Sequence, residues 1–274
     1  MYLYTNQNSK LVLTPFNNVL TSSLDITDSH AISLISRMTA SGETPTLTRQ
    51  LAINNCIVAL KANNLFQNQF DVLVTTRSHG RNSAKMNWIK NNSNASEFSG
   101  GGVLSFSTDI GYQSDGLYSY LDTNYTPSTV NNLLQLNDGC FIVKVEGIIS
   151  NYSFHGASNI ANTSFLCMSS TIPGGYSRMN SSAFGGGFLL GWNCITRNNS
   201  TTMNIINAST STPYTISSIA VPDKNMHILH LNYTGQVLFA GSTEINELYA
   251  CGKSITLSQF ITFQSIMNNY FSTF

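Results

Sequence analysis

Hydrophobic and polar residues follow two different periods along the chain. In the first third, apolar residues recur at helical spacing, as Ala31, Leu34 and Met38 do. From Ser99 onward, apolar and polar residues alternate in short runs separated by Gly, Asn, Asp and Pro, as in the run from Phe141 to Val145. The pattern predicts a helical block, residues 28 to 90, followed by antiparallel strands.

Two helices and a third, shorter one are expected in the helical block. The first begins after Asp28-Ser29, a capping pair, and ends at Ser41-Gly42. The second begins after Thr44-Pro45, since proline suits a first helical turn, and weakens at Asn63-Asn64. The third covers Asn82 to Lys90, where Trp88 is expected to anchor the helices on a sheet.

The last element is predicted to be a helix. Thr256-Leu-Ser-Gln259 has the form of a capping box, and apolar residues follow it at helical spacing. Because no long helical crossovers separate the strands before it, the fold class is mainly β: an antiparallel β-sandwich, such as a jelly roll, with an N-terminal helical block and a C-terminal helix. Residues 27–274 then form one domain, and residues 1–26 form an arm or edge strands.

The stretch DIGYQSDGLYSYLDT, residues 109–123, predicts a hairpin. Asp115-Gly116 tolerates the positive φ angles that a type I′ turn requires, and it lies between Ile110–Tyr112 and Leu117–Leu121. Alternation then places Tyr118 and Tyr120 on one face of the second strand. The segment is expected to hold two paired strands over a core.

Charge is scarce and balanced, which narrows the classes of partner. The chain has 13 basic and 13 acidic residues, 9% charged residues in all, and no basic cluster. Nucleic-acid or anionic-membrane binding is therefore not expected. No apolar run approaches the roughly 18 residues of a membrane span, and the start of the chain does not resemble a secretion signal.

The five cysteines are scattered and are expected to be buried free thiols, as suits assembly in a reducing cytoplasm. They are Cys56, Cys140, Cys167, Cys194 and Cys251.

Three blocks of the sequence, in order, resemble a domain common in virion proteins of tailed bacteriophages, which is related to concanavalin-like and laminin-G-like sandwiches. The first block comprises Arg37-Met-Thr39, Arg49, Ile53-Asn54, Ile57, Leu60-Lys61, Phe70-Asp71, Leu73, Ala84 and Asn87-Trp88. The second comprises Gly111-Tyr112, Asp115-Gly116 and Tyr120 to Thr123, and the third runs from Gly252 to Tyr270.

This resemblance implies a concanavalin-like β-sandwich in a tail fibre, head fibre or capsid decoration. The resemblance implies that the partners are other virion proteins and that the chain forms a homo-oligomer, with a trimer as the expected state. The implied location is the virion, which is assembled in the host cytoplasm. Residues 1–26 fall outside the resemblance and are the candidate virion anchor.

Two residue pairs invite a catalytic or metal-binding interpretation. Glu244 and Glu247 are spaced by three, which on a strand points them to opposite faces, whereas a retaining glycosidase needs its carboxylates about 5 Å apart. They are interpreted as solvated loop acids. His227 and His230 also face apart on a strand, so a half-exposed sheet position is favoured over a metal site.

No catalytic residue, cofactor or metal is expected. The primary hypothesis is a non-enzymatic phage virion structural protein, acting as a fibre knob, head decoration or receptor-binding module. The alternative is a carbohydrate-binding module for host adhesion, and a glycan depolymerase is less favoured. If a host-surface glycan is bound, the candidate loop residues are Gln113, Asp115, Arg197, Asn198 and Asn199.

Overall fold

The computed structural model describes residues 2–7, 10–15, 26–147, 153–159, 161, 164–170, 177–233 and 243–274. Near the N-terminus, β1 (Tyr2–Gln7) and β2 (Lys10–Pro15) pair antiparallel in a two-stranded sheet of their own. The rest of the predicted N-terminal arm, residues 16–25, lies outside the described residues.

Two large sheets make up the body of the protein. The seven-stranded sheet has the order β11-β10-β9-β15-β7-β4, with β16 paired to β9. Its strands are β4 (Ser96–Ser99), β7 (Ser119–Asp122), β9 (Ser153–Ser158), β10 (Phe165–Ser170), β11 (Ser177–Ser181), β15 (His227–Ile228) and β16 (Leu231–Asn232). All its pairings are antiparallel except that of β16 with β9.

The eight-stranded sheet has the order β14-β13-β12-β8-β17-β6-β5, with β3 paired to β17, and is antiparallel throughout. Its strands are β3 (Phe70–Thr75), β5 (Leu104–Ser107), β6 (Gly111–Ser114), β8 (Gly139–Glu146), β12 (Gly191–Arg197), β13 (Thr202–Asn207), β14 (Thr210–Thr215) and β17 (Ile245–Gly252).

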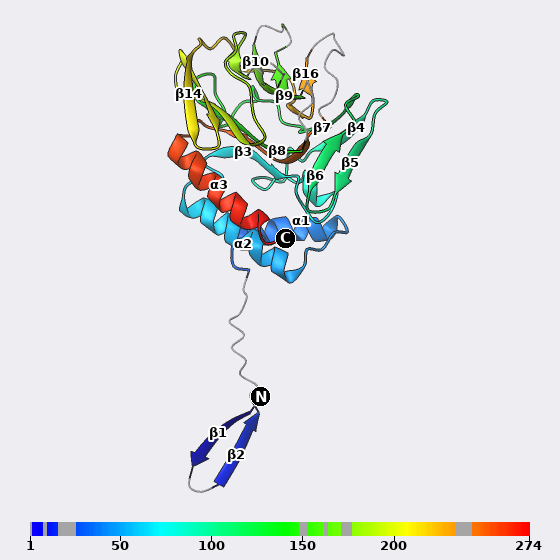
Figure 1. Cartoon of the computed structure of the whole chain (residues 1–274), viewed down its shortest axis with the longest axis vertical. Coiled ribbons are helices and arrows are strands. Elements are labelled where there is room, and N and C mark those ends of the chain that lie inside the picture. The colour runs from blue at the N-terminus through cyan, green and yellow to red at the C-terminus, as the bar shows by residue number, and fades with distance from the viewer. Residues whose placement is uncertain are drawn as a thin grey trace.

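The helices form a third layer. Figure 1 shows α1 (Ser29–Ala40), α2 (Leu47–Ala62) and α3 (Leu257–Phe271) together on one side of the strands, with β9, β10 and β16 on the opposite side. The described part of the chain contains no helix long and apolar enough to cross a membrane. The predicted fold class, a mainly β sandwich with an N-terminal helical block and a C-terminal helix, is confirmed.

Alternation along the strands divides the core into two clusters. In β8, Phe141 and Val143 point between the two sheets, whereas Cys140 and Ile142 point toward the helices. β8 lies in the middle of the three layers, so both of its faces are buried. This is why its central residues are apolar on both faces.

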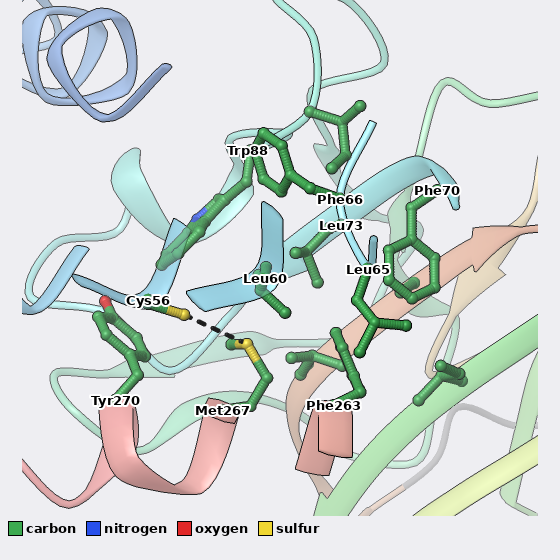
Figure 2. Packing of buried hydrophobic residues seen from close by; sticks show 14 of the residues in the cluster. Cys56, Leu60, Leu65, Phe66, Phe70, Leu73, Trp88, Phe263, Met267 and Tyr270 are labelled. Atoms are coloured by element: carbon green, nitrogen blue, oxygen red, sulfur yellow. Dashed lines mark hydrogen bonds between the residues drawn. The ribbon is translucent and has the colours of Figure 1, made fainter. Parts of the chain in front are cut away.

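The helix layer packs on the eight-stranded sheet through aromatic side chains (Figure 2). The Phe263 ring lies 5.2 Å from Phe70 of β3, and the Trp88 ring meets Tyr270 edge-on at 5.1 Å. Trp88 is 1% exposed, as expected of a packing anchor. All five cysteines are free and buried, which confirms the expectation for the thiols.

Local sequence signals, such as capping residues and terminal glycines, predict the positions of the three α-helices. Asp28 caps α1 by accepting from the His30 and Ala31 backbone N–H groups, and Gly42, at φ +86°, follows its end. Thr256 and Gln259 form the predicted capping box of α3.

The predicted helix over Asn82 to Lys90 is wrong beyond its first turn. Ser83–Lys85 forms a single 3-10 turn, η1. The Trp88 N–H then donates to the Leu73 carbonyl of β3, and the Asn87 Oδ1 accepts from the Leu73 N–H at 3.2 Å. These bonds to a strand replace the helical ones.

The predicted hairpin around Asp115-Gly116 is also wrong. β6 pairs with β5 and β17 in one sheet, while β7 pairs with β4 and β15 in the other. Only Gly116 of the two turn residues has a positive φ, +85°, so the turn is not type I′. Instead, the Asp115 carboxylate accepts from the backbone N–H groups of Val103 and Leu117, and the chain crosses between sheets.

Candidate functional site

The outer face of the seven-stranded sheet lies on the side of the molecule away from the helices (Figure 1). Leu121 of β7 and Ile228 of β15 point inward to the core between the sheets. Since neighbouring residues of a strand point to opposite faces, Tyr120, Asp122 and His227 point outward. This face therefore presents polar and aromatic side chains.

Four rings form a row on this face, which we call the aromatic row: Phe98, Tyr120, His227 and His230. Phe98 of β4 is the cross-strand partner of Tyr120 of β7, and their stacked rings lie 4.7 Å apart. The Tyr120 ring also stacks on His227 at 4.1 Å and on His230 at 4.9 Å. The strand register thus builds a continuous stack across β4, β7 and β15.

Phe98 is the accessible end of the row. Its strand, β4, is an edge strand, and the residue is 47% exposed. Its ring stacks on Tyr120, and nearly half of the residue's surface remains open to solvent and to a ligand. Gly100 leaves room for the ring, because a Cβ at that position would lie 2.6 Å from a Phe98 ring carbon.

Hydrogen-bonding groups lie beside the row. The Asp122 carboxylate accepts from the Asn124 backbone N–H at 2.8 Å and from the Asn225 amide at 3.3 Å, and its side chain is 27% exposed. Binding sites for polar organic ligands combine apolar or aromatic surface with a few fixed polar groups. An exposed ring beside a carboxylate and amides can pack the C–H face of a sugar and bind its hydroxyls.

The prediction that His227 and His230 face apart is wrong. Leu229 has φ +66°, which breaks the strand between β15 and β16 and turns His230 back toward His227. Their Nδ1 atoms lie 3.3 Å apart. Burial, together with the nearby His230 and Lys224, lowers the pKa of His227 to about 3, and burial lowers the pKa of His230 to about 4, so both rings are neutral at pH 7.

The interpretation of Glu244 and Glu247 as solvated acids is wrong as well. Glu244 is fully buried and accepts from His155 Nε2 at 2.9 Å, and Glu247 is 5% exposed and pairs with Lys144 and Arg77. Among the described residues, Glu244 pairs with a histidine and Glu247 with two basic side chains, and both are buried, unlike the accessible carboxylate pair of a retaining glycosidase.

The Glu244–His155 pair does not supply a general base. The His155 Nδ1 accepts from the Leu229 backbone N–H at 3.1 Å, which leaves the proton on Nε2, facing Glu244. Both ring nitrogens are occupied and the side chain is fully buried. The pair connects β9 to the β15–β16 turn and to the start of β17.

Ser83, His79 and Glu43 include the residue types of a catalytic triad, but their bonds are in the wrong order. The Glu43 carboxylate accepts from Ser83 Oγ at 2.8 Å, whereas a triad acid would orient the histidine. His79 Nε2 contacts the Glu43 carbonyl at 2.9 Å, so that nitrogen holds a proton and cannot accept one from Ser83. Ser83 is fully buried.

Tyr112 and Glu97 could suggest a tyrosine nucleophile, which some glycoside hydrolases use. The Tyr112 hydroxyl donates to Glu97 at 2.6 Å, but the side chain is fully buried between the sheets. Burial and Glu97 raise the pKa of Tyr112 far above its usual value. A sugar cannot reach this oxygen.

The predicted loop residues do not come together. Gln113 of β6 pairs with Ile245 at the start of β17, while Arg197 pairs with Gly139 at the far end of the sheet's central strands. β8 and β17 lie between their strands. Gln113 and Asp115 are exposed, as are Asn198 and Asn199.

Arg197 is fully buried, and its guanidinium donates to the carbonyl of Asn199 at 3.3 Å. Asn198 borders a polar cavity of about 160 Å³, which Thr196, Asn204 and Ser211 also line. Any ligand binding by the loop residues stays a prediction.

Comparisons with known proteins show the fold alone. No family model matches the chain, and no curated protein matches it. A mutant of Trypanosoma rangeli sialidase displaying trans-sialidase activity is similar in structure, with 7% identity and a TM-score of 0.50. The match covers 80% of this chain and 39% of the sialidase chain, so this chain spans well under half of that protein.

Two further structures match with lower TM-scores. One is domain 4 of AbnA, an arabinanase from Geobacillus stearothermophilus, in complex with arabinotriose, with 11% identity, a TM-score of 0.42, and coverage of 70% of this chain and 99% of that domain. The other is the ligand-binding domain of botulinum neurotoxin serotype D with N-acetylneuraminic acid, with 11% identity, a TM-score of 0.45, and coverage of 74% and 52%.

Proposed function

We propose that the outer face of the seven-stranded sheet binds a glycan and that the chain is a non-enzymatic recognition module. The observation that carries this proposal is the Phe98 ring, exposed at the end of the aromatic row beside the Asp122 carboxylate. The four catalytic arrangements considered above are buried or wrongly ordered, which supports recognition over bond cleavage.

The test is glycan-array binding of the purified chain and its variants. Phe98→Ala and Tyr120→Ala remove the end of the row and its support, and loss of about 1–2 kcal/mol of stacking weakens binding roughly tenfold. Tyr120→Phe keeps the stacked ring and retains most of the affinity. Phe184→Ala removes a more exposed aromatic side chain, 62% exposed, outside the row and leaves binding unchanged.

The proposal fails if no glycan is bound, or if Phe98→Ala and Phe184→Ala bind alike. Cleavage of the bound glycan, detected as a fall in polymer viscosity, would contradict the non-enzymatic part.

The ordered resemblance to phage virion domains favours a second candidate: a virion structural protein in a fibre or head decoration. Under this second proposal, the chain forms a homo-oligomer, with a trimer as the expected state, and contacts other virion proteins. Residues 1–26 anchor it to the virion. The two readings are compatible, since a fibre tip can bind host-surface glycan. If the chain binds no glycan on the array but associates stably with virus particles, a purely architectural role is supported.

A further inference from the structure

Two histidine nitrogens face each other at the distance that one metal ion spans. His227 Nδ1 and His230 Nδ1 lie 3.3 Å apart. Two Zn–N bonds of about 2.0–2.1 Å at a tetrahedral angle separate their nitrogens by roughly 3.3–3.4 Å.

The backbone is held in an uncommon conformation to achieve this. Leu229, between the two histidines, has φ +66°, a left-handed value that is uncommon for leucine. Its N–H donates to the buried His155 Nδ1, and its own side chain is fully buried, so the surrounding structure fixes the turn. Strain of this kind concentrates at ligand sites.

A carboxylate and an aromatic ring lie beside the two imidazoles. Asp122 Oδ2 lies 3.9 Å from His227 Nε2, the nitrogen on the far side of the ring from His230. This distance is too long for a hydrogen bond, but it places a negative charge beside the histidine pair, which favours a bound cation. The Tyr120 ring, stacked on both imidazoles, restricts their rotation.

We propose that His227 and His230 bind one divalent transition-metal ion, such as Zn²⁺, through their Nδ1 atoms, with the charge of Asp122 nearby. Imidazole suits Zn²⁺, Cu²⁺ and Ni²⁺ better than Ca²⁺ or Mg²⁺, which prefer oxygen. The described residues contain no group of three metal-ligating side chains, so water fills the remaining positions. Such a site keeps open positions on an accessible face.

Equilibrium dialysis of the full chain, free of any histidine tag, against Zn²⁺ tests the proposal. We expect one bound equivalent, which is lost in both His227→Gln and His230→Gln. Asp122→Asn removes a negative charge close to the ion and weakens binding about tenfold. His30→Gln, a partly exposed histidine on α1, binds as the unaltered protein does.

Nitrogen-15 NMR of the histidine side chains supplies a second readout. Zn²⁺ should shift the Nδ1 resonances of His227 and His230 together and leave His155 unchanged. The proposal is overturned if the protein binds no Zn²⁺ beyond the level of His227→Gln, or if folded His230→Gln retains the ion. Should His227→Gln fail to fold, His230→Gln, at a half-buried position, decides the outcome. No glycan enters either assay, so failure of the proposed function leaves this result intact.

Discussion

Glu97 is a carboxylate that points into the protein and is stabilised there by three donors. Its partners are Arg81, Lys85 at 3.0 Å and the Tyr112 hydroxyl at 2.6 Å. Burial alone would raise the pKa of Glu97, but these bonds outweigh it and hold the pKa at about 2. The ionised form is therefore favoured in the folded protein far more than in the unfolded chain.

This linkage predicts a specific dependence of stability on pH. The pKa of Glu97 is near 4.5 in the unfolded chain and about 2 in the folded protein. Ionised Glu97 therefore contributes its full stabilisation at pH values above 4.5, and this contribution is lost as the pH falls from about 4.5 toward 2. Glu97→Gln should lower the free energy of unfolding at pH 7 by about 1–3 kcal/mol and flatten its pH dependence in that window. Urea unfolding at a series of pH values measures both.

The matched control is Glu146→Gln. The Glu146 side chain is 45% exposed beside Lys144, so this substitution should lower the free energy of unfolding by less than about 1 kcal/mol. An unchanged slope in Glu97→Gln below pH 4.5 would contradict the assignment.

Single residues of the candidate site were only partly predictable. Alternation predicts only that Tyr120 shares one strand face with Tyr118; its stacking on Phe98 depends on which strand lies beside it, and β4 joins β7 from about twenty residues upstream. The convergence of His227 and His230 depends on the φ of Leu229, which no turn residue signals. Such contacts are fixed by tertiary structure, not by local sequence.

At the scale of elements, α3 holds the helix layer on the eight-stranded sheet. Phe263 is fully buried against Phe70 and Trp192, while Ile261, two residues earlier, is 42% exposed. The Trp192 indole N–H also donates to Asn268 of α3 at 3.0 Å.

Phe263→Ala should therefore lower the free energy of unfolding by about 3–5 kcal/mol, because it removes a core ring and leaves a cavity. Ile261→Ala, on the exposed face of the same helix, should change it by about 0.5 kcal/mol or less. Chemical denaturation monitored by circular dichroism compares the two, and similar losses would show that the helix does not pack as described.

The helices could be predicted from sequence because caps, glycine ends and spacing all lie within one element. The strand pairing could not. Asp115-Gly116 carries the local signature of a hairpin, yet β6 finds its partners in β5 and β17, the latter more than a hundred residues away. Competition among many strands decides such pairing, and a turn signal alone does not.

For the whole molecule, three packed layers leave four of the five thiols inside, and the fifth, Cys167, is buried in a small separate cluster with Phe165 and Leu231. Cys140 and Cys194 lie between the eight-stranded sheet and the helices, and Cys251 lies between the sheets. Burial raises the pKa of every one of the five thiols, which removes the reactive thiolate.

We expect a thiol reagent such as dithionitrobenzoate to label none of the cysteines rapidly in the folded protein and all five after denaturation. The rate of labelling in the native state should be set by how often the fold opens, or by the fraction of molecules that are open at any time. Rapid labelling of one cysteine under native conditions would indicate that its layer opens independently of the others.

The crossing at residues 115–118 joins β6 of one sheet directly to β7 of the other. A one-residue slip in the pairing of either strand would turn its buried side chains outward, and this short connection leaves too little slack for the slip. Tyr120, on which the other three rings of the aromatic row stack, lies on the strand that follows this connection, so its position relative to the second sheet depends on these four residues.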